Sequence, residues 1–300
     1  AVKKYSEFYG VACGNKNVFF TNNDSAYESA FCLHNKGIKV EAIIDIRDNS
    51  NSKIVKAVED AGIKIHWSHT VVDTSGYKRL KNISVMKLSN DGMSVTGNRI
   101  EISCDCLGVS GGWTPAVHLF TQSGGKLSFD EENKVFLPSK YPSEQISVGS
   151  CNGDFKINQI IKNLSKNLKD FLKIEQTDFD NIRVDIDDEK SKRNIWLLPS
   201  DKPIGKTKPF VDYQNDATAK DIKLALREGF RSIEHVKRYT TTGMGTDQGK
   251  LGNMHALGII ADTAGVKMGE LGTTTFRPPY TPLTFGTIVG RNVGKFFDIF

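Results

Sequence analysis

Residues 16–69 show two alternating patterns of hydrophobic positions. The runs "NVFFT" and "KVEAIIDIRD" are apolar over consecutive positions, as in buried strands, whereas "AYESAFCLHNKG" has the spacing of a helix that Gly37 ends. "NSKIVKAVEDAGIKIHWSH" repeats the same order, with a helix from about Ser52, a stop at Gly62 and a third strand. Strands that alternate with short helices predict a parallel α/β layer.

The pattern changes after His69. Up to about residue 110 the chain reads as three or more strands, separated by "SG", "NDG" and "TGN", and these turn signals predict an antiparallel meander. The later stretches "CLGVSGGWTP" and "ISVGSCNGDFKINQIIKNL" each predict a strand that runs into a glycine-bearing turn. The second of these turns is expected to open a helix.

The second half of the chain reads differently. Residues 176–208 are rich in Asp, Lys, Ser and Pro, which is typical of a linker. Three helices are then predicted, in "TAKDIKLALREGF" with Thr218 as its cap, in "SIEHVKRYT" and in "GNMHALGIIADTAG". The proline-containing tail "TTTFRPPYTPLTFG" is expected to be extended.

Composition narrows the class of protein. A length of 300 residues suggests two domains. The net charge of +5 permits an anionic cofactor but, without a dense Lys/Arg face, does not indicate nucleic-acid binding. The odd number of cysteines without framework spacing indicates a reduced, cytoplasmic protein, and no apolar run approaches the roughly 18 residues of a membrane span. The start at Ala1 and the apolar end "GKFFDIF" predict truncation of a longer protein.

The first strand-to-helix turn of the α/β layer is "TNNDSA", residues 21–26. In a dinucleotide-binding fold, glycines at this turn let the backbone approach a pyrophosphate, and this turn has none. It therefore predicts a degenerate unit kept for architecture rather than a working phosphate site. Asp45, at the end of the next strand, stands where a ribose-binding acid would, and without the glycines we interpret it as a helix cap or surface residue.

Two later glycine turns are better candidates for a nucleotide site. Gly111 and Gly112 follow one predicted strand, and Gly149 and Gly153 follow another. Open α/β sheets bind ligands at such strand ends, although an ordinary tight turn is the alternative for each motif.

The sequence predicts neither a catalytic residue nor a metal site in this chain. His66 and His69 lack partnering cysteine or acidic clusters. Cys104 and Cys106 read as a buried pair on one face of a strand. Cys151, beside glycines, has no evident base that would make it a reactive thiol.

The segment "EHVKRYTTTGMGTDQGK", residues 234–250, suits an anionic ligand such as a phosphate. Lys237 and Arg238 end a predicted helix, where cations also favour the helix dipole, so a structural role would explain them as well. The other candidates for ligand contact offer side-chain polar groups or glycine backbone: Thr240, Thr241, Thr242, Gly243, Gly245, Gln248 and Lys250. A phosphate or flavin contact and a structural turn are both open interpretations of this loop.

These motifs together resemble a known family. "FVDYQNDATAKDIKLALREGFRSIEHVKRYTTTGMGTDQGK", followed by "GTTTFRPPYTPLTFG", closely resembles the alpha subunits of heterotetrameric sarcosine oxidases. "VFFTNNDSAY" and "SGGWTPAVHLFTQSGGKL" match the same subunits, so that the resemblance covers essentially the whole chain.

The resemblance implies an architecture of the pyridine-nucleotide flavoprotein reductase type, with Rossmann-like dinucleotide-binding domains. Residues 1–15 and 99–175 would be the remaining part of an outer NAD-binding domain whose glycine fingerprint lies upstream, and residues 16–98 an inserted second Rossmann-like domain with the meander. Residues 176–208 would be a linker and 209–270 a small helical domain. Residues 271–300 would be an extended segment leading to a missing C-terminal domain.

The resemblance also implies cofactors. NAD is expected at the two glycine turns, on Gly111, Gly112, Trp113, Gly149, Ser150, Asn152 and Gly153. Ser150 stands where many flavin-binding relatives have an acid, which argues against FAD here. FMN is expected at an interface with the beta subunit, contacted by the loop that includes Lys237, Arg238, Gln248 and Lys250. FAD would belong to the beta subunit.

The small helical domain resembles a [2Fe–2S]-binding domain that has lost its cysteines. In amine and opine dehydrogenase relatives such a domain holds the cluster on four cysteines. The matching stretches here are "VDYQND" and "MGTDQGK", where Asp247 stands at a cysteine position. Because such clusters need thiolate ligands, we expect no iron–sulfur cluster in this chain.

The implied function is that of an alpha subunit in a complex with beta, gamma and delta subunits. The complex would demethylate sarcosine to glycine with formation of hydrogen peroxide, and the amine would be oxidised on beta. Formation of 5,10-methylenetetrahydrofolate would require the missing C-terminal domain. Alternatives are a stand-alone NAD(P)-linked flavin oxidoreductase, a dimethylglycine oxidase or dehydrogenase subunit, and a structural subunit with vestigial nucleotide sites.

Overall fold

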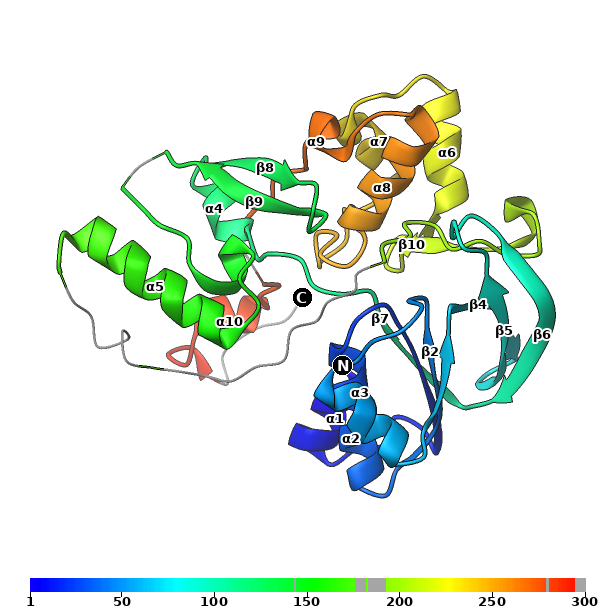
Figure 1. The fold of residues 1–300 in the computed structure, drawn as a ribbon. Helices are drawn as coiled ribbons and strands as arrows, with labels where there is room; N and C mark the ends of the chain where they lie inside the picture. The colour runs from blue at the N-terminus through cyan, green and yellow to red at the C-terminus, as the bar shows by residue number, and fades with distance from the viewer. Residues whose placement is uncertain (143, 176–181, 183–192, 279–280, 295–300) are drawn as a thin grey trace. The chain divides into compact units, whose positions relative to one another are not determined.

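The computed structural model describes residues 1–142, 144–175, 182, 193–278 and 281–294. The chain forms two compact units (Figure 1). Residues 1–113 and 184–207 make the first unit, and residues 114–183 and 208–300 make the second. None of the described helices combines the length and the apolarity needed to cross a bilayer.

A four-stranded parallel sheet forms the centre of the first unit. Its strands are β1 (Lys16–Thr21), β2 (Lys39–Asp45), β3 (Lys64–Trp67) and β7 (Cys106–Ser110), in the order β3-β2-β1-β7. Helices α2 (Ser25–Asn35) and α3 (Lys53–Asp60) connect the first three strands, and α1 (Val2–Tyr9) precedes them. This arrangement confirms the predicted parallel α/β layer.

Both faces of this sheet are covered, which explains the unbroken apolar runs of its strands. Val18, Phe20 and Ile44 pack on one face against the antiparallel meander of β4 (His69–Gly76), β5 (Leu80–Leu88) and β6 (Val95–Ser103). Phe19 and Ile43 pack on the other face, against α2 and α3. Figure 1 shows the three layers. The predicted meander is thus confirmed.

The first unit continues through β6 and β7. β6 crosses the boundary expected between residues 98 and 99. β7 then pairs in parallel with β1 and supplies the last strand of the central sheet, so the unit extends to Trp113. A strand in the sheet has to satisfy its backbone groups on a neighbour, and for β7 that neighbour is β1.

The segment expected to be a linker is in part packed on the first unit. Ile195 and Leu198 lie against the core between the sheet and the meander. Nη2 of Arg193 donates hydrogen bonds to the carbonyls of Ser89 and Asn90, both at 3.0 Å. Residues 176–181 and 183–192 of the expected linker lie outside the described residues.

The second unit begins with a hairpin rather than a parallel sheet. It contains α4 (His118–Gln122), the hairpin strands β8 (Lys126–Asp130) and β9 (Val135–Lys140), a 3-10 turn (Gly149–Asn152) and α5 (Ile157–Leu172). The strand expected in "ISVG", before the glycine turn, does not form, because no neighbouring strand pairs with residues 146–148 among the described residues. The helix expected after the glycine turn is present as α5.

The helical part of the second unit follows the short strands β10 (Phe210–Asp212) and β11 (Ala217–Thr218). The predicted helices are α6 (Ala219–Arg227), α7 (Ile233–Thr240) and α8 (Asn253–Ala264), followed by the short α9 (Met268–Leu271). Thr218 caps α6 in a capping box with Asp221, as predicted. Ile222, Val236 and Ile260 are buried between these helices.

The tail is not extended throughout. Residues 285–289 form a short helix, α10 (Phe285–Val289). The side chain of Thr284 accepts the backbone N–H of Thr287 and so caps its first turn. The prolines that led us to expect an extended chain all precede this cap, which leaves the helix free to form.

Candidate functional site

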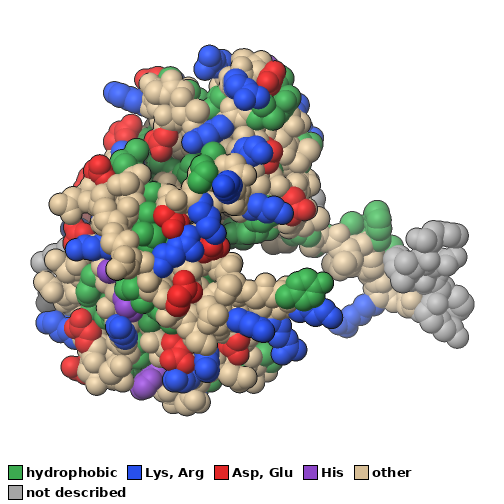
Figure 2. All heavy atoms as spheres, turned by 90° about the vertical axis from the view of Figure 1, so that its right-hand side faces the viewer, with side chains coloured by type: hydrophobic (Ala, Val, Ile, Leu, Met, Phe, Trp, Pro, Cys, Tyr) green, Lys and Arg blue, Asp and Glu red, His purple; other side chains and the backbone are tan. Residues whose placement is uncertain are grey.

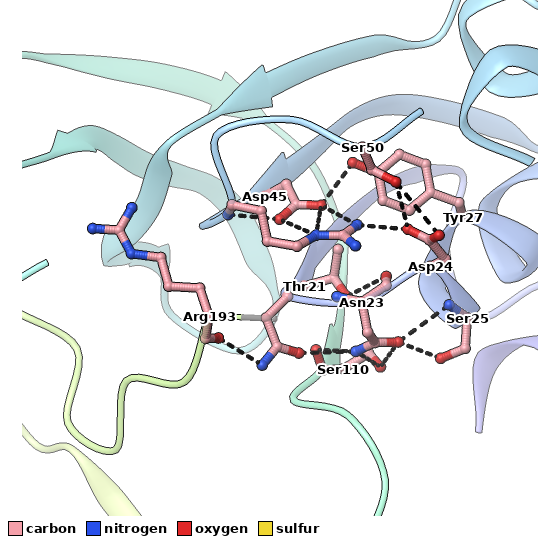
Figure 3. A network of polar contacts seen from close by, with 11 residues as sticks. Thr21, Asn23, Asp24, Ser25, Tyr27, Asp45, Ser50, Ser110 and Arg193 are labelled. Carbon is pink, nitrogen blue, oxygen red and sulfur yellow. Dashed lines mark hydrogen bonds and ion pairs between the residues drawn. The ribbon is translucent and has the colours of Figure 1, made fainter. Parts of the chain in front are cut away.

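The carboxyl edge of the parallel sheet holds a buried ion cluster (Figure 3). Nη2 of Arg47 lies 2.8 Å from Oδ2 of Asp45 and 2.8 Å from Oδ1 of Asp24. The hydroxyl of Tyr27 donates to Oδ2 of Asp45 at 2.8 Å. Arg47 and Asp45 are fully buried, so the interpretation of Asp45 as a helix cap or surface residue was wrong.

Electrostatics accounts for the charges in this cluster. Burial acts to lower the pKa of Arg47, but hydrogen bonds and charge from Asp45 and Asp24 outweigh it and raise that pKa. Burial, followed by the Asp45 carboxylate, raises the pKa of Tyr27. The cluster therefore consists of a guanidinium between two carboxylates with a neutral phenol, and its acid is not free to bind a ribose.

The glycine-free turn at the start of α2 is filled by its own side chains (Figure 3). Nδ2 of Asn23 donates to the carbonyl of Ser110 at 3.2 Å, and Oδ1 of Asn23 accepts the backbone N–H of Ser25 at 3.2 Å. Nδ2 of Asn22 donates to the carbonyl of Arg193 at 3.1 Å. With Asp24 at the helix N-cap as well, this turn does not fit a pyrophosphate, which needs free N–H groups and no carboxylate there.

The first predicted nucleotide turn, Gly111 to Trp113, ends the first unit. Gly112 has a left-handed backbone with φ of 96°. The indole N–H of Trp113 donates to Oγ of Ser25 at 3.1 Å, although the ring itself is exposed. This turn therefore joins the polar contacts at the carboxyl edge of the sheet.

The second predicted nucleotide turn, Gly149 to Gly153, lies in the second unit. Gly149 and Gly153 have φ of 75° and 83°, and a Cβ on Gly153 would lie 2.6 Å from Cδ2 of Leu137. Ser150 and Asn152 belong to the 3-10 turn between them. The next residue, Asp154, is buried, and its Oδ2 has no hydrogen-bond partner among the described residues.

A hollow lies beside the loop that follows α7, within the second unit. Its volume is about 190 Å³, and it is open to solvent. Its lining comes from α7, from the loop and from the tail: Glu234, Lys237, Arg238, Gly243, Met244, Gly245, Gln248, Thr275 and Arg277. Three cationic side chains thus meet one carboxylate, and the hollow is suited to an anionic group.

The cations of the hollow differ in how they are paired. Nη2 of Arg238 lies 3.3 Å from Oε2 of Glu234, one turn earlier on α7. Neither Lys237 nor Arg277 is ion-paired within the described part of the chain. Lys237 and Arg238 lie in the last turn of α7, as predicted. On the face drawn in Figure 2, acidic side chains lie among the basic ones. Binding of an anion therefore depends on the cations that line the hollow more than on the mild net charge of the chain.

The hydroxyls of the loop threonines make hydrogen bonds within the chain. Thr240 and Thr242 are buried, and Oγ1 of Thr240 donates to the carbonyl of Val236 at 2.8 Å. Oγ1 of Thr241 donates to the carbonyl of Thr240 at 2.6 Å. Hydroxyls at a helix end satisfy carbonyls that the helix leaves free, which explains this arrangement.

Thus the structure brings only some of the predicted loop residues to the hollow. Lys237, Arg238, Gly243 and Gln248 line it, and Lys250 does not. Sequence reasoning missed Arg277, which comes from the proline-containing tail. No local signal identifies Arg277, because the tail reaches the hollow only through tertiary contacts.

The two stretches that resemble cluster-binding loops lie against each other. Oδ2 of Asp212 accepts the backbone N–H of Gly243 at 2.7 Å, and Oε1 of Gln214 accepts the backbone N–H of Thr246 at 2.6 Å. Asp247 accepts the backbone N–H of Gly249 at 3.1 Å. Hydrogen bonds hold the two stretches together. Within the described residues, no group of three or more His, Cys, Asp or Glu side chains is placed to hold a metal ion.

The comparisons with known proteins point in one direction. The sarcosine oxidase A3 domain family matches residues 206–291. The chain is similar to a sarcosine oxidase subunit alpha of Rhizobium meliloti (strain 1021), with 34% identity over 99% of this chain and 29% of that protein. The subunit alpha of Corynebacterium sp. (strain P-1) is also 34% identical, over 99% of this chain and 31% of its own length. The chain thus spans about three tenths of these relatives.

A solved structure shares the fold. The L-proline dehydrogenase from P. horikoshii matches 96% of this chain and 52% of its own, with a TM-score of 0.52 and 16% sequence identity. At this identity the likeness concerns the fold alone.

Proposed function

The chain belongs to the family of sarcosine oxidase alpha subunits, and from this premise we propose that it is part of a flavin-dependent amine oxidoreductase complex. The complex would oxidise sarcosine to glycine and form hydrogen peroxide. We assign the amine oxidation, with FAD, to a beta subunit, and expect gamma and delta subunits to complete the complex. This chain would contribute to an FMN site at its interface with beta.

The observation that carries this proposal is the hollow with Lys237, Arg238 and Arg277. Phosphate monoesters carry close to two negative charges at neutral pH, and Arg and Lys are the side chains that recognise them. The two unpaired cations, Lys237 and Arg277, are available for an anion without the loss of an existing ion pair.

The size of the hollow fits a phosphate group better than a whole cofactor. Its 190 Å³ lies below the roughly 300–1,000 Å³ of pockets that enclose complete small molecules. The exposed side chain of Met244 at its edge offers an apolar contact beside the cations. We therefore propose that these residues hold the phosphate end of FMN, while the ring, which supplies electron transfer to oxygen when bound, lies against the partner.

A contact with NAD is proposed for the turn at Gly149 to Gly153. Its left-handed glycines give a compact backbone, and the buried Oδ2 of Asp154 would accept a hydrogen bond from a ligand hydroxyl. The turn at the start of α2 does not fit this role, because Asn23 and Asp24 occupy it.

The proposal is tested by flavin content. The chain is expressed alone and together with a beta subunit, and FMN is released from each purified sample and quantified by chromatography. We expect no flavin from the chain alone and FMN in the complex, with the double variant Lys237→Ala and Arg238→Ala losing most of it. Lys220→Ala, an exposed lysine of the same unit, serves as control. Unchanged FMN content and assembly in the double variant would contradict the proposal.

A further inference from the structure

The side chain of Gln248 binds the backbone of Arg277 in both directions. Its Nε2 donates to the carbonyl of Arg277 at 2.8 Å, and its Oε1 accepts the N–H of Arg277 at 2.8 Å. A carboxamide that pairs with both backbone groups of one residue fixes that residue as a neighbouring strand would. The sequence separation of 29 residues means that this contact joins the loop after α7 to the tail.

From this contact we infer that Gln248 is a positioning residue that holds Arg277 in the hollow, and that Arg277 is the third cation of an anion site built from two chain segments. The inference rests on the proposed function, because it explains how the same hollow recognises a phosphate group. It also changes the role first expected of Gln248, from ligand contact to support of the residue that makes the contact.

The tail segment is anchored with a period of two residues. Oγ1 of the buried Thr274 accepts from Nδ2 of Asn253 at 3.4 Å, and the ring of Phe276 lies on His118 with centroids 3.9 Å apart. Thr275 and Arg277, which alternate with these two residues, are exposed and line the hollow. The hydrogen bonds from the side chain of Gln248 to the backbone of Arg277 come at the end of this segment and fix the position of Arg277.

Gln248 itself is held in an uncommon conformation. Its φ is 53°, in the left-handed region that residues other than glycine and asparagine rarely adopt. Its N–H donates to the carbonyl of Gly245 at 2.9 Å, and its carbonyl accepts from Nδ2 of Asn253 at 3.1 Å. Such a conformation persists only where surrounding contacts fix it. Asn253 therefore holds both the loop and the tail, since it binds Gln248 and Thr274. We call the pair of hydrogen bonds between the Gln248 side chain and the Arg277 backbone the clamp.

The experiment measures how inorganic phosphate binds to the 300-residue chain at constant ionic strength, by titration of backbone amide chemical shifts. Removal of one charge-assisted contact weakens binding about tenfold, which is the expected effect of Arg277→Ala. Gln248→Met keeps the length of the side chain and removes both hydrogen bonds. We expect Gln248→Met to weaken phosphate binding about three- to tenfold. The double variant that combines Gln248→Met with Arg277→Ala should bind phosphate no more weakly than Arg277→Ala alone.

The double variant separates a positioning role from a direct contact. Additive losses would mean that Gln248 touches the anion itself, and an unchanged affinity of Gln248→Met would mean that Arg277 needs no clamp; either result overturns the inference while the proposed function stands. No response of the wild type to phosphate would remove the anion site from this chain altogether. FMN retention in the complex with beta tests the proposed function separately.

Two controls guard against a general loss of structure. Hydrogen exchange of the Arg277 N–H measures directly whether its hydrogen bond to Gln248 forms. We expect slow exchange in the wild type and fast exchange in Gln248→Met, with the exchange of the amides of α7 and α8 unchanged. Equal exchange in both proteins would overturn the inference. Arg227→Ala and Gln159→Met replace exposed residues of the same types in the same unit and are expected to bind phosphate as the wild type does.

Discussion

Oδ2 of Asp212 accepts the backbone N–H of Gly243 over 2.7 Å, and this bond joins β10 to the loop after α7. Oδ1 of the same carboxylate accepts the N–H groups of Gln214 and Asn215 at 2.9 and 3.0 Å. Burial acts to raise the pKa of Asp212, but these backbone hydrogen bonds outweigh it and lower that pKa. One ionised side chain thus joins the turn that follows β10 to the loop after α7, which lines the hollow.

Replacement of this carboxylate is expected to loosen both loops. Asp212→Asn keeps the shape but places an amide nitrogen against backbone donors, so we expect the free energy of unfolding to fall by about 1–3 kcal/mol. Because the three tryptophans all lie in the first unit, calorimetry is the appropriate measurement for the second. Asp170→Asn, exposed on α5, is the control, and an unchanged melting temperature for Asp212→Asn would contradict this role.

Gly249 is required by the close approach of Asn253. A Cβ on Gly249 would lie 2.0 Å from Oδ1 of Asn253, and its φ is 71°. Gly265, with φ of 67°, has nothing within 4 Å of the same position. We expect Gly265→Ala to cost about 1–2 kcal/mol for its backbone alone. Gly249→Ala should cost at least about 1 kcal/mol more, since it also displaces Asn253 from Gln248. If thermal unfolding shows the same loss of stability for Gly249→Ala and Gly265→Ala, then Asn253 moves away from the added Cβ without a cost in free energy.

The ion cluster of the first unit is expected to be intolerant of change. Arg47→Met leaves Asp45 buried without its cation, and removal of one partner from a buried pair costs about 3–5 kcal/mol. Tryptophan fluorescence in a urea titration follows this unit. Arg79→Met, an exposed arginine of the same unit, should unfold as the wild type does. A similar urea midpoint for both variants would mean that the cluster adds no stability.

Two buried histidines predict loss of stability in acid. Burial, with smaller effects of Lys64 and His69, lowers the pKa of His66 to about 4, and burial with Lys250 lowers that of His118 to about 4. Both values lie below the roughly 6.5 of an unfolded chain, so the unfolded state binds more protons between about pH 4 and 6.5. Stability should therefore rise with pH across that window, by up to about 1.4 kcal/mol per pH unit for each group.

The measurement for this pH dependence is the melting temperature between pH 4.5 and 7.5. His118→Phe, which keeps an aromatic ring against Phe276, should flatten the dependence. His34→Phe, at an exposed position, should leave it as in the wild type. The same slope in His118→Phe would mean that His118 is protonated in the folded protein.

Local patterns predicted the elements that depend on local chemistry. The α/β layer, the meander, the helix ending at Lys237 and Arg238 and the cap at Thr218 all follow from the period of apolar positions and from capping residues. The α10 helix was not predicted, because the prolines before it led us to expect an extended chain throughout the tail. The pairing of β7 with β1 has no local signal in the sequence, because it joins strands that are about 90 residues apart.

The sequence by itself determined that this chain is an α/β protein, that its first strand-to-helix turn lacks the glycines of a pyrophosphate site, and that one loop gathers cations and glycines. These properties depend on residue types and short spacings, which local sequence records. Only the tertiary structure decided that Asp45 is buried beside Arg47, that Thr240 and Thr242 are buried, and that Gln248 binds the backbone of Arg277 at the hollow. Burial of these side chains and the contact between Gln248 and Arg277 depend on how the segments pack together. The free energy that selects this arrangement comes from packing of the whole unit rather than from any local pattern.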